Sequence, residues 1–171
     1  MNLALIVLCL MVSWPVSANA QAGSGALREP VSDASVDDFV RALKPEVRTR
    51  SMGRNLKVEP SRIDVTVNFD FDSARLRPES TPQLERLATA MRTDALMTLR
   101  FRIEGHTDAK GGARYNEVLS AKRAQAVVDF LVGQGVGAQR LSPVGMGFSE
   151  LLDPGDPIAA RNRRVRVQTL D

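Results

Sequence analysis

The residues best suited to chemistry lie in one short polar run that leads into a helical segment. A carboxylate, Asp108, and a guanidinium, Arg123, stand fifteen residues apart, with Gly111 and Gly112 forming a turn between them. Such a pair can hold a molecule that carries both an ammonium and a carboxylate, because the planar fork of arginine suits carboxylate recognition. The same pair is poorly suited to breaking a covalent bond.

Helix phase gives Arg123 a distinctive position within the helix predicted over residues 113–132. At about 100° per residue, Asn116 and Arg123 fall in the same arc as the core-facing Val127. An unpaired guanidinium is costly to bury, so Arg123 needs a carboxylate partner. Two hypotheses remain open: a structural Asp108–Arg123 salt bridge, or a site in which Asp108 holds an ammonium and Arg123 holds a carboxylate of a ligand.

Catalytic alternatives find little support in the sequence. The single histidine, His106, is predicted to be a structural residue, because a general base needs an orienting partner and a substrate within reach. Asp70 and Asp72 flank Phe71, and we interpret them as a strand-end turn with Asx-type hydrogen bonds and one side open to a ligand. The sequence therefore predicts a protein that is not an enzyme, with no catalytic residues, metal or cofactor, and it disfavours a wall hydrolase.

The amino-terminal segment has the pattern of a secretory signal peptide. Residues 1–20 contain an apolar run that is followed by Ala18 and Ala20, which predicts cleavage after Ala20. The run is shorter than the roughly 20 apolar residues that span a bilayer. Cleavage would remove Cys9, the only cysteine, and with it any disulfide or thiol chemistry.

A cluster of arginines near the carboxyl terminus allows two interpretations. The chain carries a formal net charge of +3, and its arginines gather at Arg161, Arg163, Arg164 and Arg166. They could bind an anionic polymer outside the cytoplasm, or they could form a solvated strand edge. Nucleic acid is not an expected partner, because the signal peptide directs the chain out of the cytoplasm.

Periodicity divides the rest of the chain into a linker and one domain. We predict that residues 21–60 are a linker with a short docking helix over residues 35–44, capped by Ser35 and ended by Pro45. Period-two and helical patterns then alternate, as strand, helix, strand, helix, strand and strand, over residues 63–72, 80–91, 97–105, 113–132, 140–147 and 163–169. This βαβαββ order predicts an α+β two-layer sandwich, with the helices on one face of a small mixed sheet.

Several short motifs together resemble a known family. They are Phe69-Asp70-Phe71-Asp72-Ser73, Gly105-His106-Thr107-Asp108, Tyr115-Asn116, Leu119-Ser120, Arg123-Ala124, Gly145 with Gly147, and Asn162-Arg163-Arg164-Val165. From about Ile63 to Leu170, the chain resembles the OmpA-like peptidoglycan-binding domain, which outer-membrane proteins, peptidoglycan-associated lipoproteins and flagellar stator proteins share. The corresponding domain would cover residues 61–171.

The resemblance implies non-covalent binding of peptidoglycan through the meso-diaminopimelate of its stem peptide. In the family, the residues that match Asp108 and Arg123 grip the diaminopimelate zwitterion. Other matching positions line, support or border the pocket: Asp70, Thr107, Asn116, Leu119 and Arg164. Ile158-Ala159 stand where family members often carry a Gly-Arg pair, so any contact from that arginine is missing here.

Two functions and one location follow as expectations. The first function is tethering or positioning of an envelope component at the cell wall. The alternative is a periplasmic adaptor whose main ligand is an envelope protein that docks on residues 35–44. Both place the chain in the periplasm of a Gram-negative bacterium, either free or associated with the outer membrane.

Overall fold

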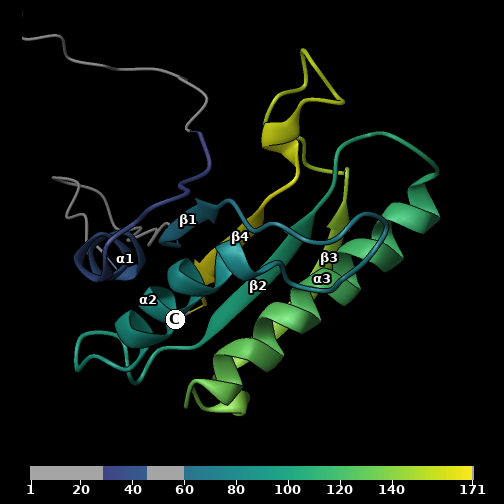
Figure 1. The fold of residues 1–171 in the computed structure, drawn as a ribbon. Helices are drawn as coiled ribbons and strands as arrows, with labels where there is room; N and C mark the ends of the chain where they lie inside the picture. The colour runs from purple at the N-terminus through teal and green to yellow at the C-terminus, as the bar shows by residue number, and fades with distance from the viewer. Residues whose placement is uncertain (1–28, 46–59, 171) are drawn as a thin grey trace, which may run out of the picture.

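A four-stranded mixed sheet with helices on one face forms the domain in the computed structural model, which describes residues 29–45 and 60–170 (Figure 1). Its longer elements are α1 (Val36–Leu43), β1 (Arg62–Val65), α2 (Thr81–Met91), β2 (Phe101–His106), α3 (Ala113–Gly133), β3 (Leu141–Gly147) and β4 (Val165–Thr169). Short 3-10 turns occupy Pro78–Ser80, Ala138–Arg140 and Ala160–Asn162. The α+β class and the βαβαββ order are thereby confirmed. The predicted signal peptide lies outside the described residues, as does much of the predicted linker.

The strand order is β1-β4-β2-β3, so the last strand of the chain lies inside the sheet. β4 runs antiparallel to both β1 and β2, whereas β2 and β3 pair in parallel. The strands joined through α2 are therefore parallel to each other with β4 between them, and those joined through α3 are direct neighbours. Right-handed crossovers predict this arrangement.

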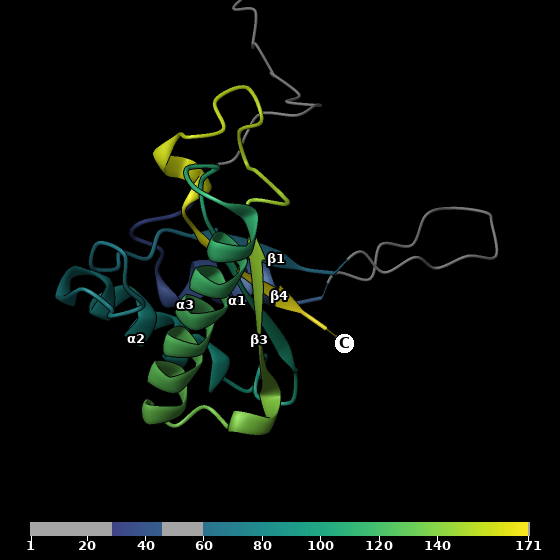
Figure 2. The same ribbon diagram turned by 90° about the vertical axis from the view of Figure 1, so that its right-hand side faces the viewer.

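The two faces of the sheet differ in chemistry. Ile103 and Val167 pair across β2 and β4 and belong to the apolar core, together with residues of α2 and α3. Figure 2 shows both helices on the same side of the sheet. The next row in the register carries Asp64, Arg166 and Glu104 across β1, β4 and β2, on the opposite face because neighbouring strand residues alternate.

The helix α1 belongs to the same core. Ser35 caps it as expected: the Asp38 amide donates to Ser35 Oγ at 3.2 Å, and the Ser35 amide donates to Asp38 Oδ2 at 3.2 Å. Phe39 and Leu43 are fully buried against the domain. The apolar stripe that predicted docking onto a partner is therefore used within the chain itself.

The first two strands begin or end differently from their predicted ranges. β1 ends at Val65, whose partner Val165 is the first residue of β4, and the chain before Val165 leaves the sheet through the 3-10 turn. Phe69 instead forms an isolated bridge with Leu76, and Phe71 is 98% exposed at the turn between them. β2 begins four residues later than predicted, because residues 94–98 form hydrogen-bonded turns.

Candidate ligand-binding site

Close packing against the sheet fixes the amino-terminal half of α3. A side chain at Gly105 would collide with the Ser120 carbonyl, and a Cβ at Gly145 would lie 2.6 Å from the Glu117 carbonyl oxygen. The Gly147 amide also donates to Ser120 Oγ at 2.8 Å. Backbone therefore lies against backbone where α3 crosses β2 and β3, and the residues on the adjacent helix face have fixed positions.

Arg123 projects from α3, and only part of its guanidinium has hydrogen-bond partners in the protein. Its Nε donates to the Ser73 carbonyl at 3.0 Å, and its Cζ lies 4.9 Å from the centroid of the Phe69 ring. Among the described residues, neither Nη atom has a hydrogen-bond partner in the protein. The segment that follows β1 thus holds this guanidinium in place while its two terminal nitrogens stay available.

The charge environment of Arg123 contains groups of both signs. Burial lowers the pKa of Arg123 and the nearby Arg163 charge lowers it further, whereas the carboxylates of Asp108 and Asp72 raise it. Asp108 therefore lies close to Arg123, as the sequence predicts. Asp72 is a neighbour that the predicted site did not include.

The partner of Asp108 is an unexpected residue. Asp108 Oδ2 lies 2.8 Å from Nη1 of Arg163, and Oδ1 accepts the Lys110 amide at 3.2 Å. The hypothesis of a structural Asp108–Arg123 salt bridge is therefore wrong. Asp108 and Arg123 lie near each other without pairing, because Arg163, from the turn before β4, already pairs with the Asp108 carboxylate.

Asn116 and Thr107, two further residues of the predicted site, have different contacts. The buried amide of Asn116 donates to the carbonyls of Lys110 at 3.0 Å and Gly112 at 3.2 Å, which fixes the turn after Asp108. Thr107 donates its backbone amide to the Gly147 carbonyl at 2.8 Å, but its buried Oγ1 has no partner in the described chain. Asn116 thus positions the loop, and Thr107 offers an unpaired hydroxyl.

The predicted turn at Asp70 forms, but with different hydrogen bonds. Asp72 has φ +53°, and the hydroxyl of Ser73, not an aspartate, accepts the Arg75 amide at 3.0 Å. Asp70 itself is exposed and its Oδ2 lies 3.8 Å from Arg75 Nε. Of the two carboxylates, Asp72 is the one that influences Arg123.

Leu119 and Arg164 complete the set of predicted residues. Leu119 is half-buried on α3. Arg164 is buried, and it donates to Asp64 Oδ1 at 3.0 Å and to the Glu150 carbonyl at 3.1 Å. Because these donors are engaged inside the protein, Arg164 holds the loop after β3 rather than facing a ligand.

The interpretation of the arginine cluster as a solvated strand edge is wrong. β4 is an interior strand, and Arg166 is buried with its Nε 2.9 Å from Asp64 Oδ1 and its Nη1 3.0 Å from Glu150 Oε2. Arg161 and Arg163 keep partly exposed side chains. The cluster thus divides into a buried structural pair and an outer pair, of which Arg163 reaches the site.

His106 lies on the charged face of the sheet. Its side chain is buried, and its Nε2 is 3.4 Å from Glu104 Oε2 without hydrogen-bond geometry, so both ring nitrogens lack a partner. Burial lowers the pKa of His106 below 6.5, more than the Glu104 carboxylate raises it. The imidazole is therefore neutral near physiological pH, and the described residues place no nucleophile against it.

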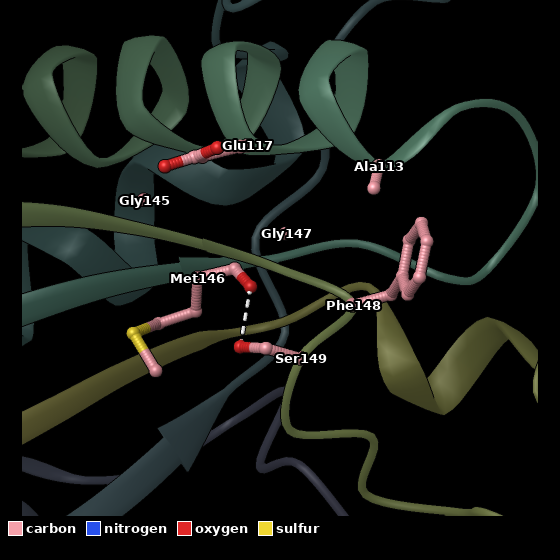
Figure 3. Close-up of a pocket in the computed structure, with 7 residues that line it drawn as sticks. All are labelled: Ala113, Glu117, Gly145, Met146, Gly147, Phe148 and Ser149. Carbon is pink, nitrogen blue, oxygen red and sulfur yellow. Dashed lines mark hydrogen bonds between the residues drawn. The ribbon is translucent and has the colours of Figure 1, made fainter.

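A separate cavity of about 330 Å³ lies on another side of α3, between that helix and the end of β3 (Figure 3). Its lining consists of Ala113, Glu117, Gly145, Met146, Gly147, Phe148 and Ser149. None of the predicted site residues is among them, and Glu117 is the sole ionisable one. The cavity lacks the paired charges that a zwitterion needs. Among the residues that the structure describes, there is also no group of three or more His, Cys, Asp or Glu able to hold a metal.

A profile of the OmpA family matches residues 68–165, a range that contains Asp70, Asp108, Arg123 and Arg164. The chain belongs to the OmpA family. Outer membrane protein A of Klebsiella pneumoniae is 41% identical over 105 residues, which cover 61% of this chain and 30% of that protein. The peptidoglycan-associated lipoprotein of Agrobacterium fabrum is 35% identical over 116 residues, which cover 64% of each chain. This OmpA-family chain thus spans about a third of the outer membrane protein A relative.

Solved structures agree with this membership. The cell wall anchor of the T6SS from Pseudomonas aeruginosa is 28% identical, with a TM-score of 0.55 over 78% of this chain and 92% of that one. The peptidoglycan-associated lipoprotein from Burkholderia pseudomallei is 30% identical, with a TM-score of 0.52 over 60% and 87%. As a member of this family, the chain is a structural or binding protein and not an enzyme. No helix in residues 29–45 or 60–170 has the length and apolarity to cross a membrane.

Two residues near the site, Asp72 and Arg163, were missed as candidates. Both stand in motifs that the sequence displays, one beside Asp70 and the other beside Arg164. Asp70 and Asp72 are two residues apart, so alternation puts both on the same side of a strand and cannot tell which one lies nearer Arg123. Likewise, adjacent arginines at a strand start point to opposite sides, and only the fold decides which one faces the site.

Proposed function

We propose that this domain binds peptidoglycan non-covalently through the meso-diaminopimelate of the stem peptide, and so positions an envelope component at the cell wall. One observation carries the proposal: Arg123 is held by Ser73 and Phe69 with both Nη atoms unengaged, close to the carboxylate of Asp108. A guanidinium fork beside a carboxylate matches a carbon that carries both a carboxylate and an ammonium.

The neighbouring groups assign a task to each part of such a ligand. The ligand carboxylate lies against the Nη atoms of Arg123, and the ligand ammonium replaces the Arg163 guanidinium at Asp108. Thr107, with its buried and unpaired hydroxyl, borders the pocket beside Asp108. Leu119 contacts the methylene chain, and Asp72 adds negative charge on the Arg123 side. No covalent bond is formed or broken in this scheme.

The names of the relatives support the same proposal. Two of them are called peptidoglycan-associated lipoproteins, and a third is called a cell wall anchor. With such a ligand the domain would work in the periplasm of a Gram-negative bacterium, and the name of the relative outer membrane protein A supports an envelope location.

Pull-down with purified sacculi tests the proposal. Asp108→Ala and Arg123→Ala should each weaken binding by about 2–5 kcal/mol, because each leaves the opposite charge of the ligand without a partner. Arg41→Ala is the matched control, since Arg41 lies on the exposed side of α1 and its side chain is 77% exposed. Wild-type binding by both site variants would show that the proposed pocket is not the binding site.

An adaptor function through residues 35–44 is less well supported. The apolar side chains that would dock a partner, Phe39 and Leu43, are buried in the domain's own core. A partner would have to bind the remaining polar side of α1. Co-purification of a partner from envelope extracts by the wild type, but not by Asp37→Lys/Arg41→Glu, would restore the adaptor hypothesis.

A further inference from the structure

Arg163 occupies the position that a ligand ammonium would need. Its Nη1 lies 2.8 Å from Asp108 Oδ2, and the other oxygen of Asp108 already accepts the Lys110 amide. The Asp108 side chain is 14% exposed, whereas that of Arg163 is 49% exposed. The carboxylate is thus sheltered, and the cation that covers it stands at the surface.

The backbone around Arg163 is anchored on both sides. The preceding Asn162 is fully buried, and its side-chain Nδ2 donates to the carbonyls of Asp156 at 2.9 Å and Pro157 at 3.2 Å. The Arg164 carbonyl, on the other side, accepts the His106 amide at 2.9 Å. Any displacement from Asp108 therefore involves the Arg163 side chain alone, which can turn away from Asp108 without moving the fold.

Two guanidiniums share the neighbourhood of one carboxylate. The charge of Arg163 lowers the pKa of Arg123, so the two cations repel each other across the site. The negative charge of Asp108, which pairs with Arg163 and raises the pKa of Arg123, offsets part of this repulsion. A lone ligand cation that takes Asp108 would add a third positive charge, whereas a ligand that also brings a carboxylate restores the balance.

We propose that Arg163 is a specificity-determining residue, which covers Asp108 in the free protein and yields to an ammonium only when the ligand also brings a carboxylate. This inference rests on the proposed function and deepens it. Diaminopimelate carries an ammonium and a carboxylate on the carbon at the far end of its side chain. This one carboxylate can pair with both Arg123 and the displaced Arg163. A lysine at the same place in a stem peptide offers the ammonium alone and leaves both guanidiniums without an anion.

Two synthetic peptides isolate this difference. L-Alanyl-γ-D-glutamyl-meso-diaminopimelate and L-alanyl-γ-D-glutamyl-L-lysine differ by a single carboxylate, and isothermal titration against the full chain gives an affinity ratio for the pair. In Arg163→Gln, the ratio should fall about three- to tenfold, which is the range expected for a partly exposed charge contact. Arg163→Lys retains the charge and should restore much of the ratio.

Arg161→Gln serves as the matched control. Arg161 has a similarly exposed side chain but pairs with Glu29 at 2.9 Å, away from Asp108, so its variant should keep the wild-type ratio. If the wild type prefers the diaminopimelate peptide and Arg163→Gln keeps the same preference, the role of Arg163 is refuted and the proposed function stands. If the wild type binds neither peptide, both are refuted. Thermal unfolding of each variant establishes that the ratio is measured on folded protein.

Discussion

Two clusters of arginine and aspartate in this domain behave differently. On the charged face of the sheet, Asp64 receives Nε of Arg164 at 3.0 Å and Nε of Arg166 at 2.9 Å, and both arginines are buried. At the end of β2, Asp108 receives the half-exposed Arg163, while Arg123 nearby keeps its terminal nitrogens unengaged.

The difference separates structural charge from charge available for binding. In the first cluster every guanidinium nitrogen of Arg164 and Arg166 donates to an acceptor of the protein, including the Glu150 carbonyl and carboxylate, and both side chains are buried away from a ligand. In the second cluster the donors outnumber the acceptors, and one cation can leave. The two clusters contain the same residue types. They differ in how many guanidinium nitrogens have hydrogen-bond partners and in how exposed the side chains are.

The largest expected effect is on the buried cluster. Asp64→Ala leaves Arg164 and Arg166 buried without their shared carboxylate, and this should lower the free energy of unfolding by about 3–5 kcal/mol. Urea denaturation followed by circular dichroism measures the change. A loss below 1 kcal/mol would mean that the cluster is not the structural one, and the comparison would fail.

The second effect should appear in binding and not in stability. Arg123→Lys keeps the charge but removes the planar fork and the Nε contact with Ser73, so sacculus binding should weaken by about 1–3 kcal/mol. The free energy of unfolding should change by less than about 1 kcal/mol, because the guanidinium is not fully engaged. A variant that loses stability and keeps binding would reverse the roles of the two clusters.

A third effect concerns pH and the histidine beside the buried cluster. Burial and the charges of Arg164 and Arg166 lower the pKa of His106, and only Glu104 raises it. The unfolded chain therefore binds more protons than the native one below about pH 6.5, so stability falls as the pH drops through that value toward the lowered pKa of the folded state. His106→Gln should flatten the difference in unfolding free energy between about pH 7.5 and pH 5.5. An unchanged difference would assign the pH dependence to other groups.

The smallest effect should come from an ion pair at the surface. Arg86 lies 2.6 Å from Asp33, the shortest ion-pair distance among the described residues, but the Asp33 side chain is 89% exposed. Asp33→Ala should therefore cost less than about 1 kcal/mol of unfolding free energy in urea. A larger loss would show that distance, and not burial, governs these pairs.

Local sequence patterns predicted where each helix and strand lies more reliably than which elements pack beside it. The helix expected over residues 113–132 is Ala113–Gly133, and Ser35 caps α1 as expected, because periodicity and capping are properties of adjacent residues. The first strand was predicted too long, since alternation continues after Val65 where the partner strand has ended. Strand order is not a local property, and for that reason the interior position of β4 and its arginines was missed.

The candidate site shows the same division. The proximity of Asp108 and Arg123 followed from helix phase and from the turn that precedes the helix. The pairing of Asp108 with Arg163 could not be predicted, because the two are fifty-five positions apart in the sequence, with α3 and β3 between them, and the loop that leads to Arg163 has no periodicity. Burial of Phe39 in the core was missed for a related reason: an amphipathic stripe indicates that a helix packs, but not on what.

The glycine contacts beneath α3 have a consequence for ligand length. Asp108 follows β2, and Arg123 stands on a helix whose backbone touches that sheet at Gly105 and Gly145. Since no side chain cushions this contact, the helix cannot shift on the sheet, and the backbones that carry Asp108 and Arg123 keep a constant separation. We expect two end groups on one carbon to suit this fixed frame better than end groups that an additional methylene separates. The domain would then select its ligands by size as well as by charge.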